Sequence, residues 1–193
     1  MNDSKIILVG NGPSVLLHDA GEVIDGFDEV VRFNNFEIQG YQMHVGTRTD
    51  ILCRRACDDV KMWPGDMFKR ILCFVTYCQH TAGMTIVAQD MKRRYGNKLE
   101  IVPPNITQAT GALIGLRQPD IEWASCGVLA IDYFARRYKH VVIHGFDGLN
   151  LNGEENVAHY YPLKPKDSKF HSGAKETAFI QELIEQGKVS RLV

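Results

Sequence analysis

The fold is decided by the stretch Lys5-Ile6-Ile7-Leu8-Val9-Gly10-Asn11-Gly12-Pro13-Ser14. Its run of apolar residues before the first glycine predicts a strand covered on both faces, as in a parallel sheet. Gly10 and Gly12 permit positive φ and a close approach of a ligand to the backbone, and Pro13 suits the first position of a helix. The start of such a helix offers free N–H groups and a positive dipole end to an anion. The stretch therefore predicts a turn that holds phosphate.

This turn differs from two familiar glycine-rich nucleotide motifs. A dinucleotide fingerprint has a third small residue where this chain has Val15, and the end of the second predicted strand, Arg32-Phe33-Asn34, lacks the acidic residue that binds a ribose. No Gly-Lys-Ser/Thr follows, which excludes a P-loop. We therefore expect a nucleotide site that uses the amides Asn11 and Asn34, although an Asn in a glycine turn also commonly serves only as a left-handed residue.

Length and composition predict a single globular domain over residues 1–193. The hydrophobic content is 45%, and 22 basic against 23 acidic residues give a net charge of -1. This balance argues against binding to nucleic acid and against electrostatic recruitment to a membrane. The basic pairs Arg54-Arg55, Arg93-Arg94 and Arg136-Arg137 are interpreted as solvated faces. The sequence predicts nothing about the oligomeric state.

The cysteines and the N-terminus predict a cytoplasmic location. The first apolar run is too short for a secretory signal or a membrane span. The 5 cysteines are odd in number and lie in apolar, strand-like surroundings, which indicates reduced thiols in a core. Their spacing is poor for a zinc knuckle, so we expect no metal site. They are Cys53, Cys57, Cys73, Cys78 and Cys126.

Apolar runs alternate with helical patterns along the chain, which predicts an α/β, Rossmann-like fold with a mostly parallel twisted sheet flanked by helices. The expected strands are 5–9, 29–34, 50–54, 70–77, 99–102 and 140–146, and the expected helices are 13–19, 82–95, 124–138 and 174–187. Ligands of such sheets lie beyond the carboxyl ends of the strands. Asn11, Asn34 and Gly145-Phe146-Asp147 would meet there. The segments 54–68, 103–122 and 148–170 are loop-like in composition, and we expect them to contribute contacts to a ligand at this edge.

A second group of polar residues lies toward the C-terminus, in His159-Tyr160-Tyr161 and in His171, which precedes Ser172 and Glu176. An imidazole titrates near working pH, so both histidines are acid–base candidates. The alternatives are that each histidine is an ordinary surface residue. Glu176 would then be only a favourable acid near the start of a helix with Ser172 as N-cap.

Four blocks of the sequence, in order, resemble the sialyl motifs of the sialyltransferases of glycosyltransferase family 29. The first runs from Val9 to Asp50 through Val9-Gly10-Asn11-Gly12-Pro13-Ser14 and Val45-Gly46-Thr47-Arg48-Thr49-Asp50, and the second joins Ser125-Cys126-Gly127-Val128-Leu129-Ala130 to Val141-Val142-Ile143-His144-Gly145-Phe146. The third is His159-Tyr160-Tyr161, and the fourth is His171 with four residues before Glu176. The opening Gly-Asn-Gly-Pro-Ser is also similar to that of the bacterial sialyltransferases of family 42.

The resemblance implies the sialyltransferase variant of the GT-A fold. It also implies an inverting, metal-independent transfer of sialic acid, or of a related sugar such as Kdo, from a CMP donor to a glycan hydroxyl. No cofactor is implied, and the partners are the nucleotide sugar and the acceptor. The absence of Asp-x-Asp agrees with a metal-free reaction. The implied donor-binding residues are Gly10, Asn11, Gly12, Ser14, Asn34, Ser125, Cys126, Gly127, Gly145, Phe146 and Tyr160, with Arg32 and Glu176 in support.

By the family 29 pattern, His171 is the base that removes the acceptor proton and His159 hydrogen-bonds the departing phosphate. In family 42 the base resembles the histidine of the His-Tyr pair, which here is His159. Two other functions stay open. One is a CMP-binding protein without transferase activity, and the other is a Rossmann-type oxidoreductase, which Val15 disfavours.

Overall fold

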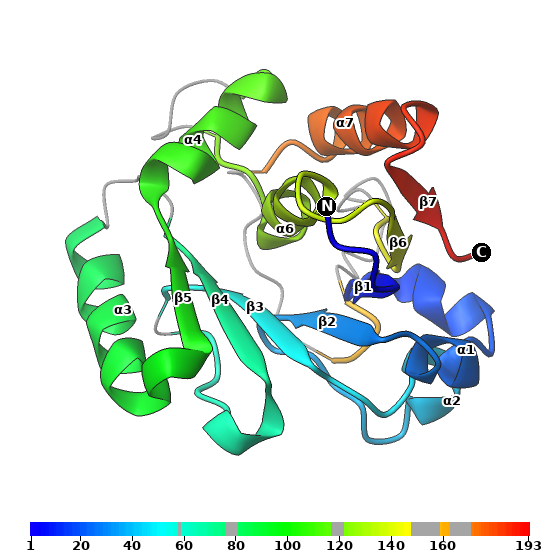
Figure 1. Cartoon of the computed structure of the whole chain (residues 1–193), viewed down its shortest axis with the longest axis horizontal. Helices are drawn as coiled ribbons and strands as arrows, with labels where there is room; N and C mark the ends of the chain where they lie inside the picture. Colours follow the sequence, from blue (N-terminus) through cyan, green and yellow to red (C-terminus); the bar gives the residue numbers. More distant parts are fainter. Residues whose placement is uncertain (58, 76–80, 117–121, 148–158, 163–170) are drawn as a thin grey trace.

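The computed structural model describes residues 1–57, 59–75, 81–116, 122–147, 159–162 and 171–193. Its centre is a seven-stranded parallel sheet in the order β5-β4-β3-β2-β1-β6-β7 (Figure 1). The strands are β1 (Ile6–Val9), β2 (Glu29–Phe33), β3 (Ile51–Arg55), β4 (Arg70–Phe74), β5 (Leu99–Val102), β6 (Val141–His144) and β7 (Val189–Arg191). The predicted parallel α/β fold is confirmed.

Helices cover both faces of this sheet. The α-helices are α1 (Gly21–Asp25), α2 (Gln42–Val45), α3 (Thr81–Tyr95), α4 (Pro104–Leu113), α6 (Cys126–Ala135) and α7 (Gly173–Glu185), and the 3-10 helices are η1 (Pro13–Leu17), η2 (Gly65–Met67) and η3 (Gly96–Lys98). α4, α6 and α7 lie on one face (Figure 1). η1, α1, α2 and α3 lie on the other, where the first three cover β1 and β2 and α3 covers β3 and β4.

Strand alternation assigns each side chain to one of these faces. Ile6 and Leu8 of β1 pack in the core under α6 and α7, whereas Ile7 and Val9 pack under η1 and α1. In β3, Cys53 enters the first core, whereas Leu52 enters the core under α3. A strand buried on both faces requires the continuous apolar runs from which the strands were predicted.

The chain order reverses beside β1. β2 to β5 extend the sheet on one side of β1, and the chain then returns to place β6 and β7 on the other side. Ile7 pairs with Val30 of β2 and with Val142 of β6. The carboxyl ends of β1 and β6 therefore meet at a topological switch point, which is where ligands of open α/β sheets bind.

The structure corrects several predicted elements. Residues 13–19 form only the 3-10 helix η1, and the segment 103–122, predicted as a loop, contains α4. β7, α1 and α2 were missed because each is at most five residues long and carries too little periodic signal. The predicted loop 148–170 lies outside the described residues except for 159–162.

The prediction that the cysteines are reduced core thiols agrees with the structure at the cysteines that it describes. Cys53, Cys73 and Cys126 are buried free thiols, and Cys57 is half-buried. Burial raises the pKa of the Cys73 thiol to about 12, so this side chain stays a neutral part of the core. Cys78 lies outside the described residues.

Arg54 contradicts the prediction that the basic pairs lie on solvated faces. Its side chain is fully buried on the α3 face. It donates to the carbonyl oxygens of Val60 at 3.2 Å, Lys61 at 3.1 Å and Cys57 at 3.3 Å. The guanidinium thus satisfies backbone acceptors of the segment that follows β3, where a buried cation would otherwise be costly.

Gly145, which follows β6, tests the close approach at the switch point. Its φ is +73°, and a Cβ added there would lie 2.4 Å from Cγ1 of the buried Val15. Gly187 has a similar φ of +69° but no atom within 4 Å of an added Cβ.

We expect Gly187→Ala to cost about 1 kcal/mol of unfolding free energy from backbone strain alone. We expect Gly145→Ala to cost about 1–3 kcal/mol more, because Val15 must move.

Urea unfolding of the two variants measures this difference directly. Gly187→Ala is the matched control for the left-handed backbone. Equal losses of stability in the two variants would contradict a packing constraint at Gly145.

Candidate functional site

The glycine turn after β1 is held against the turn after β6. The Gly10 N–H donates to the carbonyl oxygen of His144 at 2.8 Å, and the Gly12 N–H donates to that of Gly145 at 3.0 Å. A Cβ on Gly10 would lie 2.3 Å from the Gly145 carbonyl oxygen, and one on Gly12 would lie 2.5 Å from Oδ2 of Asp147. Both glycines are therefore needed for the contact between two strand ends, in addition to any approach of a ligand.

The helix that follows this turn does not offer a free anion site. Oδ2 of Asp147 accepts from the Ser14 backbone N–H at 2.9 Å, and Oδ1 accepts from the Ser14 hydroxyl. η1 is also too short for a helix dipole of useful size. A carboxylate of this chain thus holds the donors of Ser14, and the expectation that the glycine turn binds phosphate stays a prediction.

Asn11 carries an unused acceptor at the switch point. Its Nδ2 donates to the carbonyl oxygen of Phe33 at 3.2 Å, which fixes the orientation of the amide. Its Oδ1 is buried and has no hydrogen-bond partner among the described residues. A buried acceptor without a partner is costly, so Oδ1 is suited to receive a donor from a ligand, such as a hydroxyl or amino group.

Asn34 follows β2 in the left-handed conformation, with φ of +48°. Its Oδ1 accepts from the backbone N–H of Arg55 at 3.1 Å, and its carbonyl oxygen accepts from Nε1 of Trp63 at 2.9 Å. These bonds tie the ends of β2 and β3 together. The side-chain Oδ1 is therefore occupied by the protein, which leaves Nδ2 as the group for a ligand.

The N-terminus of α6 lies at the same edge of the sheet, with Ser125 as its N-cap. The Ser125 hydroxyl accepts from the Val128 N–H at 3.3 Å. Glu176 of α7 accepts from the Ser125 N–H at 2.7 Å and from the Ser125 hydroxyl at 2.6 Å. The predicted supporting role of Glu176 thus has a geometric basis, in which Glu176 connects the starts of α6 and α7.

The first turn of α6 presents backbone rather than side chains. The Cys126 side chain is buried, and burial raises the pKa of its thiol. A Cβ on Gly127 would lie 2.9 Å from Cε1 of Phe146, so this glycine is needed for the contact with the β6 turn. The N–H groups of Cys126 and Gly127, in the first turn, have no acceptor within the helix. The start of α6 therefore also offers N–H donors to an anion, as the sequence predicts for the helix that begins at residue 13.

His171 is fixed as a neutral imidazole beside this helix end. Its Nδ1 lies 2.8 Å from the carbonyl oxygen of Trp123, which accepts only, so Nδ1 carries the proton and Nε2 carries the lone pair. Burial lowers the pKa of His171 to about 4, and the nearby Arg55 guanidinium contributes to the lowering. The ring also packs edge-on against Trp123 at 6.2 Å. Nε2 is a proton acceptor at neutral pH.

His159, Tyr160 and Tyr161 lie over the β1–β2 end of the sheet. The Tyr160 N–H donates to the carbonyl oxygen of Asn11 at 2.9 Å, and its hydroxyl donates to that of Glu37. The His159 ring packs against Tyr161 at 5.3 Å, and burial lowers the pKa of His159. Tyr160 is thus joined to the glycine turn, and its role in donor binding stays a prediction.

Arg32 acts inside the fold. It is buried on β2, and Nη2 donates to the carbonyl oxygen of Val45 at 2.5 Å, while Nε donates to Arg48 and Thr49 oxygens at 3.0 Å. Burial lowers its pKa to about 10. Its supporting role is the positioning of the loop before β3.

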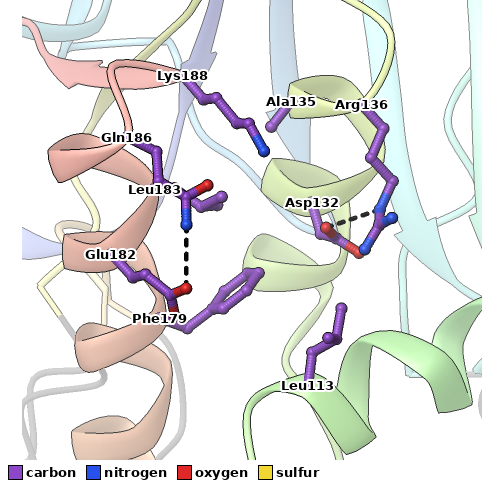
Figure 2. Close-up of a pocket in the computed structure, with 9 residues that line it drawn as sticks. All are labelled: Leu113, Asp132, Ala135, Arg136, Phe179, Glu182, Leu183, Gln186 and Lys188. Carbon is purple, nitrogen blue, oxygen red and sulfur yellow. Dashed lines mark hydrogen bonds and ion pairs between the residues drawn. The ribbon is translucent and has the colours of Figure 1, made fainter.

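A separate hollow lies among α4, α6 and α7 (Figure 2). Four of its polar side chains form two pairs: Asp132 accepts from Nε of Arg136 at 2.9 Å, and Gln186 donates to Glu182 at 3.0 Å. It opens along the later turns of α6, away from Ser125, and its lining residues include none of the predicted site residues.

Within the described ranges, no group of three or more His, Cys, Asp or Glu side chains is placed to hold a metal ion. No helix described there is long and apolar enough to cross a membrane.

Known proteins resemble this chain in sequence. Residues 4–63 match the model of glycosyltransferase family 29 (sialyltransferase). Lactosylceramide alpha-2,3-sialyltransferase of Rattus norvegicus is 22% identical to this chain, in an alignment that covers 97% of this chain and 56% of the relative. The same enzyme of Mus musculus is 31% identical, and the alignment covers 97% of this chain and 52% of the relative. CMP-N-acetylneuraminate-beta-galactosamide-alpha-2,3-sialyltransferase 4 of Mus musculus is 26% identical over 97% and 64%. The chain thus spans between half and two thirds of the length of these relatives.

Solved structures share the fold. A mammalian sialyltransferase superposes with a TM-score of 0.66 at 16% identity, covering 98% of this chain and 69% of that one. The sialyltransferase CstII from Campylobacter jejuni, in complex with the substrate analogue cytidine-5'-monophosphate, superposes with a TM-score of 0.61 at 16% identity, covering 100% and 81%. The fold is the Rossmann-like, GT-A-like fold of the sialyltransferases, and the predicted resemblance of this chain to the sialyltransferases of glycosyltransferase family 29 is confirmed.

Proposed function

We propose that this protein is a glycosyltransferase that moves sialic acid, or a related sugar such as Kdo, from a CMP donor to a hydroxyl of a glycan acceptor. The observation that carries the proposal is the arrangement of His171 beside the N-terminus of α6. His171 offers an acceptor for a proton, and the α6 helix end offers donors for an anion. A transfer reaction with an anionic leaving group needs both.

The chemistry assigned to the two groups is complementary. The acceptor hydroxyl is a weak nucleophile until its proton is removed, and Nε2 of neutral His171 is the proposed base. CMP departs as a phosphate monoester anion, so donors aimed at that phosphate stabilise the transition state more than a strong acid would. The proposed donors are the N–H groups of Cys126 and Gly127, with His159 as an additional hydrogen-bond donor. Attack from the face opposite the phosphate inverts the anomeric centre.

We propose further that the reaction needs no metal. A metal in other nucleotide-sugar sites neutralises the phosphate charge, and carboxylates hold it. Here the carboxylates nearest to the switch point, Asp147 and Glu176, are engaged with Ser14 and Ser125. The positive end of α6 would supply the neutralising charge instead.

The first test is a thermal-shift titration with CMP, UMP, AMP and NAD in the presence of EDTA. We expect stabilisation by CMP, because a ligand at a hundred times its dissociation constant adds about 2.7 kcal/mol. Turnover of CMP-sialic acid or CMP-Kdo under the same conditions would then show transfer. Tight CMP binding without turnover toward any acceptor or water would favour a binding protein, and a preference for NAD would overturn the proposal.

The base is tested by replacing each histidine. We expect His171→Ala to lower kcat at least about a hundredfold, because general-base catalysis contributes on this scale, with the affinity for CMP little changed. His159→Ala should weaken phosphate binding, with a smaller loss in kcat. The control is His140→Ala, because His140 is an exposed histidine that lies just before β6, at the opposite end of the strand, and is bonded to Ser190. Near-native turnover in His171→Ala with loss in His159→Ala would reverse the two roles.

Glu176 gives a prediction for the pH dependence of stability. Burial raises its pKa to about 7 despite the two bonds from Ser125. The folded state therefore keeps a proton that the unfolded state loses, and stability from this group falls as pH rises from about 4.5 to 7. Glu176→Gln removes this titration. We expect its unfolding free energy, relative to the unchanged protein, to rise by roughly 3 kcal/mol over that pH range.

Urea unfolding at a series of pH values measures this trend. Comparing the two proteins cancels the contribution of His171, whose lowered pKa acts in the opposite sense between about pH 4 and 6.5. A difference that stays constant with pH would contradict the raised pKa of Glu176.

A further inference from the structure

Arg55 is the last residue of β3, at the carboxyl edge of the sheet. Strand alternation places it on the same face as Cys53 and on the face opposite to Arg54, so it lies under α6. Its backbone N–H is held by Oδ1 of Asn34 at 3.1 Å, which fixes the point from which the side chain leaves the strand. The side chain is half-buried.

The Arg55 guanidinium has no hydrogen-bond or ion-pair partner among the described residues, unlike other buried arginines of the sheet. Arg32 and Arg54 donate to backbone carbonyls, and Arg70 pairs with Glu100 at 2.6 Å. Glu176, the carboxyl group at the start of α7, is engaged with Ser125. A half-buried guanidinium without a counter-charge is a site for an anionic ligand, because Arg binds carboxylates in a bidentate manner.

The groups around Arg55 indicate where an anion bound to it would lie, relative to the proposed base and the proposed phosphate site. Arg55 lies on the sheet face that α6 covers, and its charge lowers the pKa of both His171 and Cys126, so the guanidinium is within electrostatic reach of the proposed base and of the helix end proposed for the phosphate. The reacting carbon of the donor must lie between these two groups. In 2-keto acid sugars such as sialic acid and Kdo, that same carbon carries a carboxylate.

We propose that the Arg55 guanidinium binds the carboxylate at the anomeric carbon of the donor sugar and thereby selects CMP-activated 2-keto acid sugars. The inference rests on the proposed function and specifies its donor. Arg55 would hold the sugar ring in the orientation for attack, while the nucleotide is bound by other residues. It is a specificity-determining residue that the sequence analysis had interpreted as part of a solvated face.

The experiment compares binding of CMP with binding of CMP-3-fluorosialic acid, a donor analogue that transfers slowly, by isothermal titration calorimetry. For Arg55→Ala we expect an affinity for the analogue about tenfold or more lower, with CMP affinity within about twofold, since bonds to charged groups contribute on that scale. The affinity of Arg55→Lys for the analogue should lie between those of Arg55→Ala and the unchanged protein, because lysine keeps the positive charge but lacks the planar guanidinium. Arg93→Ala, on the exposed side of α3, is the control for net charge.

A second measurement changes the carboxylate of the ligand. The carboxylate methyl ester of the analogue should bind the unchanged protein about tenfold more weakly than the acid, and Arg55→Ala should not distinguish the two. Equal losses for CMP and the analogue, or an effect on acceptor KM alone, would overturn the role of Arg55 while leaving the proposed function intact. Absence of CMP binding by the unchanged protein would overturn the proposed function itself.

Discussion

The site depends on the contact between the ends of β1 and β6. The two turns approach so closely that Gly10, Gly12 and Gly145 each exclude a side chain, and two backbone hydrogen bonds join them. The turn after β6 also brings Phe146 against Gly127, so the same contact fixes where α6 begins. Residues more than a hundred positions apart are thus assembled at one edge of the sheet by backbone packing.

A second constraint is that the carboxyl groups at this edge need hydrogen-bond donors. Asp147 binds Ser14 at the start of η1, and Glu176 binds Ser125 at the start of α6. Each carboxyl group comes from a distant segment and satisfies donors that would otherwise lack a partner. The two helix starts differ in what remains: η1 is a single turn, whereas α6 has ten residues and keeps first-turn N–H groups without an intrahelical acceptor. These remaining donors support the proposal that the start of α6 binds the phosphate of the donor.

The sequence predicted the six longer strands because strands buried on both faces need continuous apolar runs, and Ile6 to Val9 is such a run. It predicted the edge of the sheet at which Asn11, Asn34 and Gly145 lie, because each lies at the carboxyl end of a predicted strand. It could not predict that Asp147 accepts a hydrogen bond from Ser14, because this contact depends on how two turns that are far apart in the sequence pack together. The partners of Arg54 could not be predicted either, since adjacent strand residues point to opposite faces and the pattern does not show which face holds carbonyl oxygens.

The low pKa of His171 sets a requirement on the proposed substrate. A base with a pKa of about 4 is neutral at working pH, but it is weaker than a base matched to that pH. Two causes keep the value low, burial and the positive charge of Arg55. A donor that brings a phosphate and a carboxylate would oppose both, because anions beside an imidazole favour its protonated form and a carboxylate on Arg55 neutralises the guanidinium. A bound anionic donor would thus raise the pKa of His171 and make the proposed base stronger, which would favour proton removal from the acceptor when the sugar that receives it is present.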